Sequence, residues 1–486
     1  MLNILGRPQT VCGGVSRREL LQVAGAGLFG MSLPRLLHAE ESHSPVAPRA
    51  KSVIFLYLFG GPSQLETFDL KPKAPNKIRG PYLPIASRTP DLLISEKLEQ
   101  CAAISDKFAV VRTLSHSFND HSGGGHYVQT GKRWHIPIGA GFNATPQDWP
   151  SIGSVVEYLS QHKQHQFSQP RTREEGLPNY VVVPNSLGKI QTHSVLLQRP
   201  GEYGGWLGRG YDPITTSVDK KDAKDNPYYR ICSDEELTFQ IDGLISQDAM
   251  TLDRLGGRQS LLAQFDQKLR QRDAQKSLTA YDRFQQRALS LVASEKTRKA
   301  MDLRQESDNV RDRYGRHLFG QSTLMARRLV EAGVRYVTVH WDAPDGYGWD
   351  SHLNSKDVGD HLMPGFDQTF SALLIDLEER GLLDETLVVC LGEMGRTPLA
   401  NANWGRDHWS TLFPALVAGA GVRGGIVLGQ SDKDAAYALT PPYKPEDFAA
   451  TIYHALGIDP EIRLPDGQGR PVGLVEDGKP ILELFG

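Results

Sequence analysis

Short runs of apolar residues constrain the fold of this chain more than any other feature of its sequence. Residues 52–59 read Ser-Val-Ile-Phe-Leu-Tyr-Leu-Phe, without a charged side chain. A strand with one wet face alternates polar and apolar residues, whereas a near-continuous apolar run suits a strand that is buried on both faces, as in the centre of a parallel sheet. Further strands are predicted at 108–111, 180–183, 334–341, 386–390 and 414–417.

Helical segments are predicted between these runs. One begins near Pro364, a residue that suits the first turn of a helix, and ends at Gly381. Strands that alternate with helices imply a mostly parallel sheet covered on both faces. We therefore predict an α/β fold, a three-layer α/β/α sandwich. The other predicted helices span 98–104, 151–159, 319–332 and 446–456.

One long region departs from this alternation. From about 246 to 318, charged and apolar residues follow each other at helical spacing and prolines are few. This pattern predicts a helical insertion into a single domain that spans 40–486. The many arginines and aspartates of the insertion are expected to form a solvated helix face.

The first residues of the chain resemble an export signal. Ser16-Arg17-Arg18-Glu19-Leu20 is a twin-arginine pattern, and a short run rich in Gly and Ala follows over 23–37. That run is too short and too rich in glycine to span a membrane, so no transmembrane segment is expected. We predict a twin-arginine signal peptide over 1–39 and a periplasmic or secreted protein. The alternative is a cytosolic N-terminal helix that contains Arg-Arg.

Charge and cysteine content exclude two classes of function. The net charge is −3 and no block of Lys or Arg stands out among the 486 residues, so a nucleic-acid partner is not expected. Removal of 1–39 leaves Cys101, Cys232 and Cys390, and no Cys-x-x-Cys spacing occurs, so a zinc knuckle is not expected either. Cys390 lies in an apolar run and should be a core residue.

Four segments that follow or end predicted strands carry the residues suited to chemistry. Ligands of open α/β sheets gather at the carboxyl ends of strands. Acids and histidines on loops held by a rigid sheet can bind a divalent metal. The second of these segments, rich in His and Gly, belongs to a stretch over 115–135 that is predicted to be a loop. The four segments are 61–69, 116–131, 340–352 and 391–409.

Two acid–histidine pairs stand out in the later segments. Asp350 and His352 are two residues apart, so in an extended segment both side chains point the same way and could share one metal. Asp407 and His408 are adjacent and diverge, so one could bind the metal while the other orients it or meets a second ion. Any single histidine could instead be a hydrogen-bonded structural residue.

These segments resemble a known family. The pieces Gly60-Gly61-Pro62-Ser63, Gly392-Glu393-Met394-Gly395-Arg396-Thr397-Pro398 and Gly405-Arg406-Asp407-His408-Trp409 are similar to those of a bacterial, twin-arginine-exported family known only as domain of unknown function 1501. That family is placed within the alkaline phosphatase and sulfatase superfamily. The resemblance covers nearly everything after the signal, and it implies the superfamily's α/β/α sandwich and a metal-assisted site for phosphoryl or sulfuryl transfer.

The resemblance also implies metal ligands. His408 matches the superfamily's late metal histidine, and Asp350 with His352 resembles its middle acid–histidine pair. Glu393 stands where the acid of an Asp-His pair is expected, although Met394 replaces the histidine. The first strand lacks the expected Asp at its end, so Glu66 or Asp69 would have to substitute.

The nucleophile region matches less well. The stretch from His121 to Gly131 occupies it, without the Pro and Arg that sulfatases carry there. Ser122 is the candidate nucleophile and His121 a further candidate metal ligand. No cysteine has the required context, so a formylglycine sulfatase is not expected.

The first functional hypothesis is an exported, metal-dependent hydrolase of phosphate or sulfate esters, acting on a small molecule or a glycan. A divalent metal (zinc, calcium or manganese) would polarise the ester and activate Ser122 or a water. Arg396 or Arg406 would neutralise the ester oxygens.

The second hypothesis is a catalytically diverged binding protein on the same scaffold. The missing Asp and His ligands favour it. Its partner would be a polysaccharide or another cell-surface molecule, and Trp134, Trp206 and Trp404 could serve as binding platforms.

Overall fold

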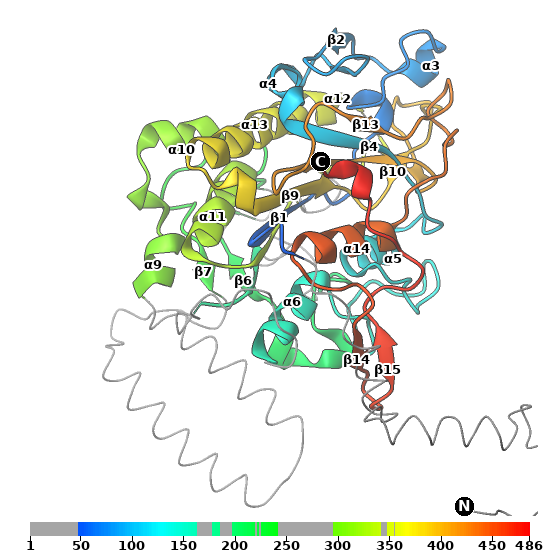
Figure 1. The fold of residues 1–486 in the computed structure, drawn as a ribbon. Helices are drawn as coiled ribbons and strands as arrows, with labels where there is room; N and C mark the ends of the chain where they lie inside the picture. The colour runs from blue at the N-terminus through cyan, green and yellow to red at the C-terminus, as the bar shows by residue number, and fades with distance from the viewer. Residues whose placement is uncertain are drawn as a thin grey trace, which may run out of the picture. The chain divides into compact units, whose positions relative to one another are not determined.

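The protein is described by a computed structural model for residues 47–162, 177–184, 197–218, 221–222, 225–241, 295–341, 348–353 and 355–486. Within this part, nine strands form one central sheet in the order β13-β4-β12-β9-β1-β8-β5-β6-β7 (Figure 1). The strands are β1 (Ser52–Tyr57), β4 (Phe108–Leu114), β5 (Tyr180–Val183), β6 (Ile214–Ser217), β7 (Gln240–Ile241), β8 (Tyr336–His340), β9 (Thr386–Leu391), β12 (Phe413–Ala418) and β13 (Val427–Leu428).

Most neighbouring strands of this sheet run parallel. Strand β1 lies at the centre and pairs in parallel with β8 on one side and β9 on the other. Strand β12 is the main exception, because it runs antiparallel to both β9 and β4. The short edge strand β7 is antiparallel to β6. All six strands predicted from apolar runs are present, shifted by at most three residues at their ends.

Alternate side chains of β1 build two separate cores. Ile54 and Leu56 belong to one buried cluster, and Val53 and Phe55 belong to the other. Both faces of the strand are therefore dry, which explains why its sequence has no polar alternation. The two cores and the sheet between them make the predicted three-layer α/β/α sandwich, which is confirmed.

Helices from distant parts of the chain cover the two faces. On one face lie α4 (Glu99–Ala103), α11 (Leu318–Ala332) and α13 (Met363–Glu379), and on the other lie α5 (His121–Thr130), α6 (Ile152–Gln161) and α14 (Pro445–Ala455) (Figure 1). Local signals set their ends. The Ser151 hydroxyl accepts a hydrogen bond from the Ser154 N–H at the start of α6, and Gly333 ends α11 in the left-handed conformation.

The predicted loop over 115–135 is wrong in its middle part, because His121–Thr130 form helix α5. Asp120 caps the helix by accepting a hydrogen bond from the Gly123 N–H, and Gly131 ends it with a φ of +68°. The glycines inside allow close packing rather than flexibility: a Cβ at Gly125 would lie 2.7 Å from the Tyr57 hydroxyl oxygen. The bracketing Asp120 and Gly131 were the signal for this helix, and the glycine run masked it.

Two predictions fall largely outside the described residues. The signal peptide over 1–39 lies there entirely, as does 246–294 within the predicted insertion. The described part of that insertion contains α9 (Glu295–Met301) and α10 (Asp308–Tyr314). No helix of the described part is long and apolar enough to cross a membrane. Cys390 is buried in the core, as predicted.

Candidate metal centre

Five strands bring the predicted site residues to one edge of the sheet. Strands β1, β4, β8 and β9 all run toward that edge, and the segments that follow them carry Gly60, His121, Asp350 and Glu393. Strand β12 runs the other way and therefore starts there, which brings His408 to the same edge just before it. The antiparallel strand thus adds a site segment to the carboxyl ends of the parallel ones.

Two short strands join the motif segments. Strand β10 (Gly395–Arg396) pairs antiparallel with β11 (His408–Trp409), so Arg396 lies opposite His408. The backbone just after β1 also lies very close to the backbone of the segment that carries Asp350. Gly60 has a φ of +109°, and a Cβ there would lie 2.5 Å from the backbone nitrogen of Asp350, so only glycine fits.

Three imidazoles converge on one carboxylate. The Nε2 atoms of His121, His352 and His408 lie 3.2, 3.0 and 3.3 Å from the carboxylate oxygens of Asp350. The Nε2 atoms of His352 and His408 are themselves 3.0 Å apart. His121, Asp350 and His408 alone already form a group that could hold a metal ion. Both acid–histidine segments and the start of α5 therefore meet at one point.

The other ring nitrogen of each histidine faces an acceptor. His121 Nδ1 lies 2.5 Å from Glu393 Oε1, and His352 Nδ1 lies 2.7 Å from Asp407 Oδ1. His408 Nδ1 lies 2.9 Å from the carbonyl oxygen of Asn119. Carboxylate and carbonyl oxygens only accept, so each Nδ1 carries a proton.

It follows that the convergent Nε2 atoms carry lone pairs whenever the rings are neutral. Two such lone pairs at the separation between His352 and His408 repel unless a cation, either a proton or a metal, lies between them. A histidine whose Nδ1–H donates to a carboxylate or carbonyl while its Nε2 faces a common point has the arrangement found around bound metals.

The dimensions and donors fit a small divalent cation. Ligands at about 2.0 Å from a tetrahedral zinc ion are separated by about 3.3 Å, close to the separations between the Nε2 atoms and Asp350. Three imidazole nitrogens and one carboxylate suit zinc or another transition metal, whereas calcium takes oxygen ligands.

Charge interactions in the group favour a cation. Burial opposes a charge on His121, but hydrogen bonds from its ring to Asp350 and Glu393 outweigh burial and raise the pKa of His121 to about 9. Burial disfavours ionised Asp350 as well, yet His121, His408 and the charge of Arg396 hold its pKa below the usual range. A proton on His121 can therefore supply a positive charge within the group.

Glu393 orients the ring of His121 in this arrangement. Its carboxylate is fully buried and accepts a hydrogen bond of 2.9 Å from the Gly60 N–H as well as the one from His121. The resemblance leads one to expect Asp just after β1. Gly60 stands there instead, and its backbone N–H donates to Glu393, the acid of the motif over 392–398.

The two predicted anion-binding arginines are buried in the protein. Arg396 Nη2 lies 2.5 Å from Asp350 Oδ1, and its remaining N–H groups meet the carbonyls of Gly60, Gly61 and Arg406. Arg396 therefore holds Asp350 in place and faces no solvent.

Arg406 and Glu66 lie outside the convergent group. Arg406 Nε donates to Glu66 Oε1 at 2.7 Å, and its other nitrogens donate to the carbonyls of Ile78, Thr397 and Pro398. Both side chains are buried. The pair fastens the loop that carries His408 to the segment after β1.

The remaining predicted residues are scattered around this centre. Ser122 lies buried in the first turn of α5, and its hydroxyl makes no hydrogen bond to a described residue. Trp134 is buried, with its Nε1–H donating to Asp148, so it is not a surface platform. Trp206 is half-buried against Trp149, and Trp404 is exposed. Sequence reasoning assigned no role to Asn119, because a backbone carbonyl has no sequence signature.

The fold and this site define an α/β/α sandwich protein with a candidate metal centre at the sheet edge. Residues 50–485 match the family described as "Protein of unknown function (DUF1501)", and the chain belongs to that family. No curated protein matches the chain.

Solved structures with a similar arrangement are sulfatases, phosphatases and related enzymes. The PsFucS1 sulfatase from Pseudoalteromonas sp. has 14% identity and a TM-score of 0.36 over 91% of this chain and 72% of its own. The lipoteichoic acid synthase LtaP from Listeria monocytogenes has 9% identity and a TM-score of 0.34, over 89% of this chain and 76% of its own. Alkaline phosphatase from the Antarctic bacterium TAB5 has 13% identity and a TM-score of 0.31, over 80% of this chain and 96% of its own.

Proposed function

We propose that this protein is a metal-dependent hydrolase of phosphate or sulfate esters. The observation that carries the proposal is the convergence of three imidazole Nε2 atoms on Asp350, while every Nδ1 is held by an acceptor. The group lies at the sheet edge where α/β proteins bind their ligands. The metal would be held by His121, Asp350 and His408, with His352 as a fourth ligand, and the donor set makes zinc the first choice.

Each neighbouring residue has a positioning role. Glu393 and Asp407 fix the tautomers of His121 and His352, and the Asn119 carbonyl fixes that of His408. Arg396 fixes the carboxylate of Asp350. A bound divalent cation would supply the Lewis acid that polarises the ester. Ser122, next to His121 in the first turn of α5, is our candidate nucleophile.

The substrate is proposed to be a small-molecule or glycan ester. An anionic ester suits a cationic centre. We also propose that the protein is exported by the twin-arginine route. Replacement of Arg17 and Arg18 by Lys should then retain it in the cytoplasm, and unchanged export of that variant would contradict this part of the proposal.

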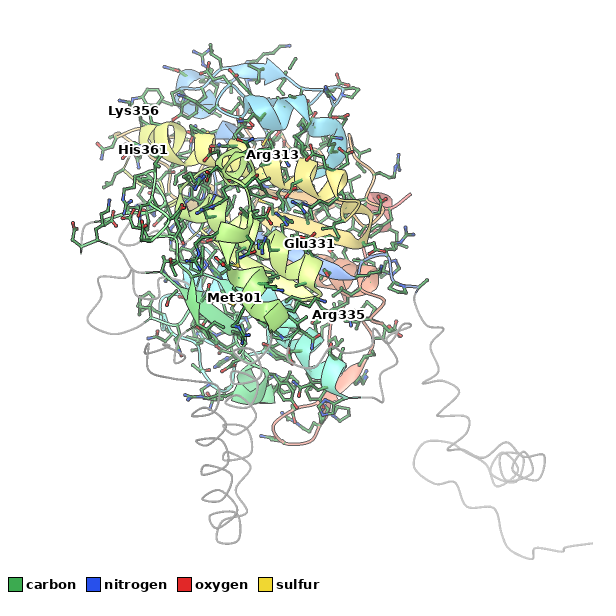
Figure 2. The ribbon with its side chains drawn as sticks, turned by 90° about the vertical axis from the view of Figure 1, so that its left-hand side faces the viewer. Met301, Arg313, Glu331, Arg335, Lys356 and His361 are labelled. Carbon is green, nitrogen blue, oxygen red and sulfur yellow. The ribbon has the colours of Figure 1, made fainter. Side chains whose placement is uncertain are left out.

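Metal analysis and a substrate screen test the proposal together. The purified protein should contain about one zinc or similar ion per chain and hydrolyse at least one phosphate monoester, phosphate diester or sulfate ester. His408→Ala should lose both properties. His361→Ala is the matched control, because His361, labelled in Figure 2, is exposed and stacks on Tyr229 rather than on a residue of the site. A protein that binds no metal, or a fully active His408→Ala variant, would contradict the proposal. Metal binding without any turnover would favour the binding-protein hypothesis.

A further inference from the structure

His121, Asp350 and His408 form a group that could hold one ion, and His352 Nε2 lies 3.0 Å from both Asp350 Oδ1 and His408 Nε2, where it can serve as a fourth ligand. Zinc sites that catalyse reactions hold three protein ligands and leave a position for the substrate, whereas closed four-ligand sites are structural. With His121, Asp350, His352 and His408 all bound, the ligand set would match a closed site, and an ester oxygen would enter most readily where one of the four gives way.

The four ligands are held with very different strength by their surroundings. Asp350 is fixed by buried Arg396. His121 lies on the first turn of α5, with its ring 5.0 Å from that of Phe59, and its partner Glu393 is fully buried. His408 lies on β11, which pairs with β10.

His352 is the least restrained of the group. Its side chain is 38% exposed, whereas those of His121 and His408 are 21% exposed. The carboxylate that orients it, Asp407, is 61% exposed. A hydrogen bond between exposed groups competes with water and holds less firmly than a buried one.

The backbone of His352 is fixed even though its ring is exposed. The carbonyl oxygen of His352 accepts a hydrogen bond of 2.7 Å from Asn401 Nδ2, and its N–H donates to the Asp350 carbonyl at 3.1 Å. Its carbonyl also lies against Gly405, where a Cβ would come within 2.0 Å. A side-chain rotation can therefore move the imidazole off the ion without moving the loop.

We propose that His352 is an exchangeable ligand, which closes the coordination of the ion at rest and yields its position to an anionic oxygen of the substrate. The inference rests on the proposed function, since it assigns a role in substrate entry to one ligand of that site. No bond of the substrate is made or broken in this exchange. One neutral imidazole leaves the ion and one anionic oxygen takes its place.

Cobalt substitution tests the exchange without relying on turnover. Four-coordinate Co²⁺ absorbs visible light more strongly than Co²⁺ with five or six ligands, so the spectrum reports the number of ligands. The wild-type protein should give a four-coordinate spectrum that changes when inorganic phosphate is added. His352→Ala should lose about tenfold in Co²⁺ affinity and bind phosphate about tenfold more tightly, because no ligand has to leave. His408→Ala should lose at least about 100-fold in Co²⁺ affinity.

Two further variants sharpen the result. Asp407→Asn keeps an acceptor for His352 but removes its charge, so phosphate affinity should lie between those of the wild type and His352→Ala. His361→Ala should match the wild type in both spectrum and affinity. Thermal unfolding of each variant checks that its fold persists.

The failures of the two proposals are distinguishable. A His352→Ala variant that loses Co²⁺ as completely as His408→Ala, or whose spectrum equals that of the wild type, overturns the exchange. Ligand exchange in a protein that hydrolyses no ester leaves the exchange standing and overturns the proposed hydrolase. A wild-type protein that binds neither zinc nor cobalt overturns both.

Discussion

Two regions of this protein bury charged side chains, and they do so in opposite ways. On the face covered by α11 and α13, Arg327 is fully buried and its nitrogens lie 2.6 to 2.9 Å from carboxylate oxygens of Glu306, Glu331 and Asp376. Figure 2 shows this side of the molecule, with Glu331 labelled. The carboxylate of Asp376 also accepts a hydrogen bond from the Tyr314 hydroxyl. Each charge of the network meets an opposite charge within the chain.

At the sheet edge the balance is left open. The Nε2 atoms of three histidines face Asp350 and one another, and the only fixed positive group that contacts this carboxylate in the described part is Arg396. The ion pairs of the α11–α13 network balance one another without an added ion, so this network stabilises the fold. The convergent group lacks such a balance without a cation, which makes it a candidate binding site.

Removing Asp350 should have the largest effect, because it serves both fold and site. Asp350→Ala should abolish metal binding and also leave buried Arg396 without its carboxylate, which lowers the free energy of unfolding by about 3–5 kcal/mol. Metal analysis and urea unfolding measure the two effects. If this variant still bound one metal ion per chain, Asp350 would not be the central ligand, and the contrast between the two regions would be wrong.

Arg327→Met should lower stability alone. It removes the fully buried cation between Glu306 and Asp376, which keep only more exposed arginines as ion-pair partners, so the free energy of unfolding should fall by about 3–5 kcal/mol. Zinc affinity, measured in the fraction that remains folded, should equal that of the wild type. A loss of affinity in this variant would show that the two regions are coupled.

Glu393→Gln should weaken the site with a smaller effect on the fold. The amide keeps the shape of the side chain but no longer offers His121 a charged acceptor, so zinc affinity should fall by about 10- to 100-fold. Competition with a chelator measures this change. An unchanged affinity would mean that Glu393 does not set the tautomer of His121.

The smallest effect concerns the pH dependence of stability. A rise in pH should lower the stability contributed at the sheet edge and raise the stability contributed at the α11–α13 face. In metal-free protein the pKa of His121 is about 9, above the unfolded value near 6.5. The stability it contributes is fully present below pH 6.5 and is lost as the pH rises through 9. Burial lowers the pKa of His317, at the start of α11, to about 4, so stability falls as the pH drops from 6.5 toward 4.

Urea unfolding at a series of pH values measures both limbs. Between pH 7 and pH 5.5, His317 should cost about 1 kcal/mol. His317→Gln should flatten the acid limb and leave the alkaline one unchanged, and His121→Gln should do the reverse. Identical profiles for the two variants would contradict the assignment.

The sequence predicted the sheet better than the site. Residues 52–59 were identified as a central strand because their hydrophobicity is a local property, and burial on both faces demands it. Asp350 and His352 were placed together for a similarly local reason, their spacing of two. The fate of Arg406 was not local: its partner Glu66 is 340 positions away in the chain, and no spacing rule shows that such a pair will be buried.

Helix α5 shows a second limit. Three consecutive glycines disfavour a helix on propensity alone, and packing overrides that preference here. A Cβ at Gly123 would lie 2.4 Å from the Phe118 ring, a contact that no property of the segment itself reveals. Which of two acids binds a metal and which one orients a histidine also depends on ångström-scale placement, as Glu393 and Asp350 illustrate.

The order of the site segments along the chain has a consequence for biogenesis. His121 belongs to the first third of the protein, whereas His408 follows it by 287 residues and precedes β12. A ribosome-bound chain that has emerged only as far as β9 contains His121, Asp350 and His352, but not His408. The proposed ion site is therefore complete only late in translation, once His408 has left the ribosome.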